Sequence, residues 1–229
     1  MNRILIILTA TFVLLSPSIA TAQVPPNASE VARYSGLHAA AHKGDIAELE
    51  RLIAAKADLN ARDPYGRTPL HVATHAGKVD AIRVLAKAGA KLGLLEKDRY
   101  DAVTIAAVAN NEEALRALLA AGASAKLTTS RYDGTALIAA AHLGHTGVVK
   151  QLIAAGAPLD HVNNLHWTAL IESIVLGDGG TRHTETLRAL VSAGANLQLA
   201  DRNGNTPLRL AKGRGYKVMV EILEKAGAK

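Results

Sequence analysis

Histidines four residues apart are the first candidates for chemistry in this sequence. His38 and His42 form one such pair, and His71 and His75 form another. Residues four apart share a face of a helix, so each pair could offer two imidazole nitrogens to a metal ion. Neither pair encloses the glutamate of a His-Glu-x-x-His motif. We therefore expect no resident metal and no cofactor, and keep metal binding only as an alternative.

A second candidate is the polar stretch around residues 172–183. Glu172 is followed by the run Gly177-Asp178-Gly179-Gly180-Thr181-Arg182-His183. A buried carboxylate needs a partner, so we expect Asp178, Arg182 and His183 to form a polar cluster with Glu172. One interpretation is a long loop tied down by ion pairs. Contact with a ligand is an alternative, and a catalytic acid–base pair is another.

Composition argues against several other chemistries. The 229 residues include no cysteine, which excludes disulfides, thiolate catalysis and cysteine-ligated zinc. We find no nucleophile elbow, phosphate-binding loop or dinucleotide fingerprint. The net charge is +6, but lysine and arginine are interleaved with acidic residues along the chain. No basic run has the density of a nucleic-acid footprint. We expect a protein that is not an enzyme and does not bind nucleic acid.

An internal repeat supplies the elements that must position these residues. The seed Thr68-Pro69-Leu70-His71 has a counterpart 33 residues earlier, Ser35-Gly36-Leu37-His38. Further copies begin at Asp101, Thr135, Thr168 and Thr206, the last one delayed by a five-residue insertion. The predicted units span roughly residues 31–63, 64–96, 97–129, 130–163, 164–201 and 202–229.

Each unit is expected to be a helix–turn–helix. Thr68 can cap the first helix with its hydroxyl, and Pro69 fits the first helical turn. Gly89 and its equivalents can end the second helix in the left-handed conformation. Lys56 takes that place in the first unit, which predicts a slightly strained cap. Residues between units, such as 63–66, are expected to form projecting turns.

The pattern TPLH-x-A…G…LL…GA, with its period of 33 residues, resembles the ankyrin repeat. The resemblance covers residues 31–229. It implies an all-α ankyrin-repeat solenoid of about six helix–turn–helix units with projecting turn or hairpin fingers. It also implies that His38 and His71 hydrogen-bond the finger backbone, which would occupy nitrogens that a metal would need.

The C-terminal part resembles a narrower group, the exported bacterial ankyrin-repeat proteins. The resemblance rests on Trp167, on Leu176-Gly177-Asp178-Gly179-Gly180 and on Gly215-Tyr216. Some members of that group are associated with protection from peroxide beside a periplasmic catalase. The resemblance therefore implies a periplasmic location and a role in oxidative-stress protection.

The N-terminus has the three parts of a secretory signal peptide. Asn2 and Arg3 give a short positive start, residues 4–15 are apolar, and Ala20-Thr21-Ala22 fits the small-residue cleavage pattern. We predict a cleaved signal peptide over 1–22 and a flexible leader over 23–30. A retained N-terminal anchor is the alternative. After cleavage we expect no stable membrane insertion and a periplasmic protein, which could later be secreted.

Large aromatic rings are concentrated in the segments that precede the first helices. Tyr34, Tyr100 and Trp167 share one column of the repeat, and Tyr65 and Tyr132 share another. Rings placed outside the core are typical of recognition surfaces. We predict that these five residues bind a partner. The alternative is that they only cover the bases of neighbouring fingers.

Together these patterns predict a non-catalytic protein–protein interaction module that acts as a monomer. It would bind an envelope protein through its fingers and concave face. One alternative is a ligand-binding protein or enzyme centred on the insertion in the fifth unit. Another is a toxin-neutralising protein or a secreted protein that binds host proteins.

Overall fold

The computed structural model describes residues 24–229, so the predicted signal peptide and its cleavage site before Gln23 lie outside the described residues. The described residues form thirteen α-helices and no named strand. The helices are α1 (Ala28–Val31), α2 (Gly36–Lys43), α3 (Ile46–Ala54), α4 (Pro69–His75), α5 (Val79–Lys87), α6 (Ala102–Val108), α7 (Glu112–Ala120), α8 (Ala136–Leu143), α9 (Thr146–Ala154), α10 (Ala169–Val175), α11 (Thr181–Ser192), α12 (Pro207–Gly213) and α13 (Lys217–Lys225).

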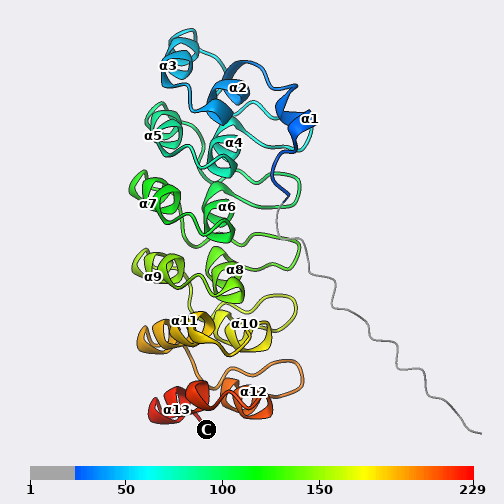
Figure 1. Cartoon of the computed structure of the whole chain (residues 1–229), viewed down its shortest axis with the longest axis vertical. Coiled ribbons are helices and arrows are strands. Elements are labelled where there is room, and N and C mark those ends of the chain that lie inside the picture. Colours follow the sequence, from blue (N-terminus) through cyan, green and yellow to red (C-terminus); the bar gives the residue numbers. More distant parts are fainter. Residues whose placement is uncertain (1–23) are drawn as a thin grey trace, which may run out of the picture.

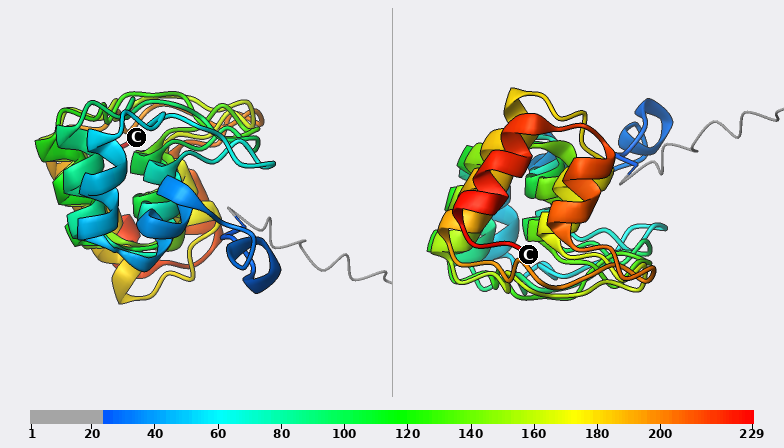
Figure 2. Two further views of the ribbon diagram at one scale, coloured as in Figure 1. Left: turned by 90° about the horizontal axis from the view of Figure 1, so that it is seen from above. Right: turned by 90° about the horizontal axis from the view of Figure 1, so that it is seen from below.

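Helices α2 to α13 form six antiparallel pairs stacked in two rows (Figure 1). The first helices of the pairs pack on one another in chain order from α2 to α12, and the second helices do the same from α3 to α13. Five loops, which we call fingers one to five, project from the first-helix side of the stack (Figure 2). They comprise residues 58–67, 91–100, 124–134, 158–167 and 196–205. The predicted all-α solenoid is confirmed.

Small aliphatic side chains hold the two rows together. Ala106 and Ala107 of α6 are fully buried, as are Leu85 of α5 and Leu118 of α7. Alanine on the first helices lets neighbouring backbones approach closely, and leucine fills the space between the two rows. The buried hydrophobic residues are alanine, valine, leucine, isoleucine and methionine, which leaves the aromatic rings for other positions.

The predicted helix caps are present. The Thr68 side chain accepts a hydrogen bond from the His71 backbone N–H, and Thr135, Thr168 and Thr206 make the equivalent contact in their units. Gly89 has a φ of 95°, in the left-handed region. Lys56 has a φ of 58° at the equivalent position, so a residue with a Cβ adopts the left-handed conformation here, which is the conformation from which strain was predicted.

Replacing Lys56 with glycine is expected to raise the free energy of unfolding by about 1 kcal/mol, because glycine adopts a positive φ without the Cβ clash. The matched control is Gly89→Ala. A Cβ there would meet no atom within 4 Å, so only backbone strain should act, in the opposite direction. Urea unfolding followed by circular dichroism measures both changes. An unchanged midpoint for Lys56→Gly would show that this cap stores no strain.

The flexible leader predicted over residues 23–30 is wrong for its last part. Residues 28–31 form α1, and the Asn27 side chain caps this helix by accepting a hydrogen bond from the Glu30 N–H at 3.0 Å. Glu30 is buried and forms an ion pair with Arg67, 37 residues further along the chain. The segment is ordered because the buried guanidinium of Arg67 requires an anionic partner.

Within residues 24–229, no helix is both long and apolar enough to cross a bilayer.

Candidate functional site

Each finger is closed by its own polar side chain. In finger one, the Asp63 N–H donates to the Arg67 carbonyl at 2.9 Å, while Asp63 Oδ1 accepts from the N–H groups of Tyr65 and Arg67. In finger four, Asn163 Oδ1 accepts from the N–H groups of Leu165 and Trp167 in the same way. These bonds give the finger tips a defined backbone shape.

Neighbouring fingers are also bonded to each other. The Lys97 N–H donates to the Tyr65 carbonyl at 3.0 Å, which joins fingers one and two. The Ser130 N–H donates to the Arg99 carbonyl at 2.8 Å, and the Asn164 N–H donates to the Tyr132 carbonyl at 2.9 Å. Fingers one to four therefore form one continuous surface that is ordered before any partner arrives.

The five predicted aromatic residues divide into two groups. Tyr65 and Tyr132, at the finger turns, have 44 % and 37 % of their surface exposed. Tyr34, Tyr100 and Trp167, at the ends of the segments that precede the first helices, are half-buried. The first group is accessible to a partner. The second group is less accessible, so for these three rings the burial favours the alternative interpretation, in which they cover the bases of the fingers.

Two exposed apolar residues of finger four extend the tyrosine surface. Val162 and Leu165 are 45 % and 39 % exposed. Leu165 occupies the same repeat column as Tyr65 and Tyr132, so the column itself could have identified it from the sequence. Val162 has no such signal. We call Tyr65, Tyr132, Val162 and Leu165 the finger surface.

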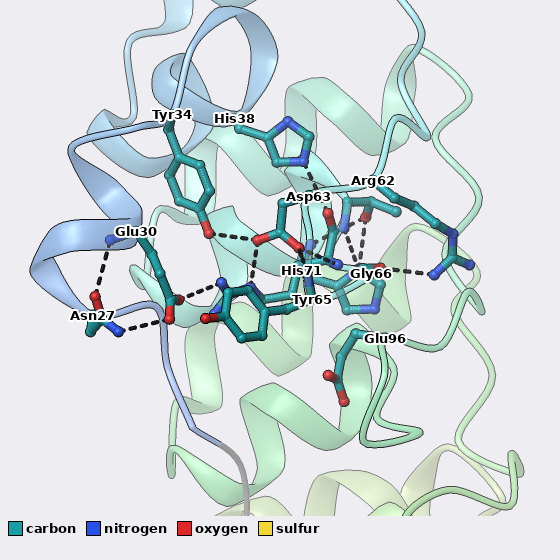
Figure 3. A network of polar contacts seen from close by, with 12 residues as sticks. Asn27, Glu30, Tyr34, His38, Arg62, Asp63, Tyr65, Gly66, His71 and Glu96 are labelled. Carbon is teal, nitrogen blue, oxygen red and sulfur yellow. Dashed lines mark hydrogen bonds and ion pairs between the residues drawn. The ribbon is translucent and has the colours of Figure 1, made fainter.

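Tyr34 belongs to a buried ionic network at the base of finger one (Figure 3). Its hydroxyl donates to Asp63 Oδ2 at 2.9 Å, and Arg67 Nε donates to the same oxygen at 2.7 Å. Arg67 also pairs with Glu30, and its guanidinium lies 4.5 Å from the centre of the Tyr65 ring. This network holds α1 against the first two units and engages the Tyr34 hydroxyl internally.

Opposite effects set the ionisation of this network. Burial alone would raise the pKa values of Glu30 and Asp63, but hydrogen bonds from Arg67 outweigh it and leave both pKa values below their ordinary range. Burial and the neighbouring Asp63 raise the pKa of the Tyr34 hydroxyl. At neutral pH the network therefore consists of two carboxylates, one guanidinium and one neutral phenol.

The histidines of the repeat seed, His38 and His71, contact the backbone of the fingers. His38 Nε2 lies 2.9 Å from the Arg67 carbonyl oxygen, and His71 Nε2 lies 2.9 Å from the Leu94 carbonyl oxygen. These contacts match what the family resemblance implied. Burial lowers the pKa of His75 to about 4, so its ring is neutral at pH 7. Within residues 24–229, no group of three or more histidine, cysteine or acidic side chains is arranged to hold a metal ion.

The polar cluster predicted around Glu172 is wrong as a single cluster, because its members lie in two places. Glu172 Oε1 accepts a hydrogen bond from Asn163 Nδ2 at 3.0 Å, and Oε2 lies 3.5 Å from His142 Nδ1. Asp178 instead pairs with His183 at 2.8 Å. Arg182 is exposed, and its backbone carbonyl oxygen accepts a hydrogen bond from the Thr146 hydroxyl. The turn after α10 carries Asp178 and His183 away from the Glu172 carboxylate.

The insertion in the fifth unit forms hydrogen bonds with the fourth unit and with the sixth unit. His183 Nδ1 contacts Asp178, and His183 Nε2 contacts the His142 carbonyl oxygen at 2.9 Å. The Tyr216 hydroxyl donates to the Gly177 carbonyl at 2.9 Å. Both imidazole nitrogens are therefore engaged, which favours the structural interpretation of this loop over a catalytic or ligand-binding one.

Family and sequence comparisons agree with this architecture. The family model for ankyrin repeats (three copies) matches residues 18–95, 37–129 and 103–180, which together span more than half of the chain. The chain is 38 % identical over 100 residues to YahD of Escherichia coli (strain K12), which is described as an ankyrin repeat protein. The alignment covers 43 % of this chain and 50 % of YahD, so the chain matches half the length of that relative.

Solved structures show the same fold over most of the chain. An ankyrin-repeat domain from Acinetobacter baumannii AYE superposes with a TM-score of 0.80 at 42 % identity, covering 84 % of this chain and 98 % of that one. A chain from the complex of the predatory endopeptidase Bd0816 of Bdellovibrio bacteriovorus with the immunity protein Bd3460 superposes with a TM-score of 0.66 at 26 % identity. That match covers 84 % of this chain and 98 % of the other. From its repeats, its stacked helix pairs and these matches, the chain belongs to the ankyrin-repeat family.

Proposed function

We propose that this chain is a non-catalytic module that binds a partner protein on the finger surface. The observation that carries the proposal is the exposure of Tyr65, Tyr132, Val162 and Leu165 on fingers that are already hydrogen-bonded to one another. Rigid, exposed aromatic and apolar side chains lose little conformational freedom on binding, which makes them effective contact residues. Ankyrin-repeat proteins are interaction modules, which supports the same class of function.

The proposed setting is the bacterial periplasm, with an envelope protein as the partner. Support comes from the signal-peptide pattern in residues 1–22 and from the resemblance to exported ankyrin-repeat proteins. A role in oxidative-stress protection follows from that resemblance and belongs to the same proposal. The chain would act there as a monomer.

A second candidate function is neutralisation of a harmful enzyme. It is favoured by the similarity to a chain from the complex of an endopeptidase with its immunity protein. Both functions use the same kind of contact, a protein held on a solenoid surface. They differ in whether the partner is inhibited, so an activity assay on the captured partner separates them.

Alanine at the finger surface is expected to weaken partner binding strongly. The chain without residues 1–22 would serve as bait in an envelope extract of the source bacterium, with Tyr132→Ala, Tyr65→Ala and Leu165→Ala as variants. We expect Tyr132→Ala to raise the Kd of the captured partner by about 30-fold or more, because the substitution removes a central contact residue.

The control is Val218→Ala, which removes a side chain of α13 that is 51 % exposed and lies outside the fingers. It should leave the Kd unchanged. Retention of the partner with wild-type affinity by all three finger-surface variants would rule out the finger surface as the interface.

A further inference from the structure

Glu172 is a buried carboxylate without a compensating cation. It is 5 % exposed and stands on α10, where the equivalent residues of other units are Val72, Ile105 and Leu210. Its ion-pair contact within residues 24–229 is with His142, and no lysine or arginine pairs with it there. Burial raises its pKa to about 7, opposed by the hydrogen bond from Asn163.

Near the N-terminal end of the solenoid, the chain neutralises a buried charge with its own side chains. Arg67 is as deeply buried as Glu172, and the chain supplies Glu30 and Asp63 to neutralise it. At Glu172 no lysine or arginine within residues 24–229 plays this part, and with a pKa of about 7 the carboxyl is only partly ionised at neutral pH. His142 does not provide a cation either, because burial, together with the nearby His183 and His145, lowers the pKa of its ring.

Asn163 holds the Glu172 carboxylate in a fixed position. Fingers one, two and five have the acidic residues Asp63, Glu96 and Asp201 at the place of Asn163. The side-chain oxygen Oδ1 of Asn163 accepts hydrogen bonds from two backbone N–H groups of its finger, so the side-chain nitrogen Nδ2 must point to Glu172. An aspartate there would set two carboxylates against each other. The asparagine and the glutamate are thus matched, and the carboxylate is preorganised.

The second oxygen of the carboxylate lies beside a partly exposed side chain. Glu172 Oε2 is 3.5 Å from His142 Nδ1, and 37 % of the His142 side chain is exposed. A side chain arriving from solvent on this side would have to displace the His142 imidazole to reach Oε2. Asn163, which bonds the other oxygen, belongs to finger four, as do the exposed Val162 and Leu165.

We propose that Glu172 receives an arginine side chain of the partner protein, with the apolar residues next to that arginine resting on Val162 and Leu165. The inference rests on the proposed function and adds the chemistry of its central contact. Arginine suits this buried site better than lysine because its guanidinium is more weakly hydrated than an ammonium group. The planar guanidinium can also bond Oε2 and stack on an aromatic face at the same time. A desolvated ion pair adds affinity only when its geometry is close, and the carboxylate fixed by Asn163 supplies one half of that geometry.

The test uses short peptides and the single tryptophan of the chain as the reporter. The Trp167 backbone N–H donates to Asn163 Oδ1, and Asn163 Nδ2 donates to Glu172, so we expect a change at the carboxylate to alter the surroundings of the tryptophan. The full mature chain would be titrated with the blocked peptide leucine–arginine–leucine and followed by tryptophan fluorescence. The same peptide with uncharged citrulline in place of arginine is the comparison.

Glu172→Gln keeps the size of the side chain and the oxygen that accepts from Asn163, but removes the charge. We expect this variant to bind the arginine peptide at least about tenfold more weakly than wild type. Glu185→Gln, which neutralises an exposed carboxylate on α11, should bind as wild type does. Equal binding by Glu172→Gln, equal binding of the citrulline peptide, or no binding of the arginine peptide would each overturn the inference.

The two proposals fail separately. If Tyr132→Ala loses the partner protein while Glu172→Gln keeps full affinity for the arginine peptide, the finger surface stands and the arginine site does not. If the arginine peptide depends on Glu172 while Tyr132→Ala retains the partner, the reverse holds.

Discussion

Replacing Arg67 with alanine is expected to lower the free energy of unfolding by about 3–5 kcal/mol. The guanidinium is 3 % exposed and is paired with two carboxylates that are themselves 9 % and 4 % exposed. Its removal would leave Glu30 and Asp63 desolvated and facing each other without a cation. The loss of stability should be larger than that caused by removing an ordinary surface charge, because the two carboxylates left behind stay buried without a cation.

Urea unfolding followed by circular dichroism measures this effect. Arg51→Ala is the matched control, because Arg51 pairs with Glu48 on the exposed side of α3 and should leave the unfolding midpoint nearly unchanged. A midpoint for Arg67→Ala that matches the control would mean that the network does not stabilise the N-terminal units. Detachment of α1 should accompany the loss, seen as faster hydrogen exchange of its backbone amides.

The second large effect is expected for Gly177→Ala. A Cβ at Gly177 would lie 2.2 Å from the Ser173 carbonyl oxygen and 2.8 Å from the His183 ring. Neither neighbour can move freely, since one is helix backbone and the other has both ring nitrogens bonded. We expect a loss of about 2–3 kcal/mol as the end of α10 and the insertion shift apart.

Gly213→Ala separates this clash from the general effect of adding a methyl group. Gly213 ends α12, and a Cβ there would meet no atom within 4 Å. Alanine should therefore be neutral there or stabilise the helix slightly. Thermal unfolding of both variants decides the matter. If Gly177→Ala is as stable as Gly213→Ala, the insertion is not packed as tightly as its contacts indicate.

The solenoid could be predicted because its signals are local. The Thr68 cap, the left-handed Gly89 and the period that repeats them each act within a few residues, and the repeat multiplies the evidence. The order of α1 could not be predicted in this way. It depends on Glu30 meeting Arg67, two residues 37 positions apart whose charges give no sign of mutual burial in the sequence.

Part of the candidate site could also be predicted from the repeat. The tyrosine column predicted Tyr65 and Tyr132 as exposed, because residues in one column of a repeat share an environment. Glu172 stood out as the charged member of an apolar column, but its partners were misassigned. Sequence proximity suggested Asp178 and His183, whereas the contacts come from Asn163 and from His142 of the preceding unit.

Site-specific photo-crosslinking tests the central claim, a partner protein held on the finger surface, most directly. A photoreactive phenylalanine analogue would replace Tyr132 in one variant and Val218 in another, and cells of the source organism expressing each variant would be irradiated. The proposed function predicts a covalent adduct of one defined protein with the Tyr132 variant and none with the Val218 variant. A Tyr132 variant that remains free of adducts, or the same adduct at Val218, would contradict it.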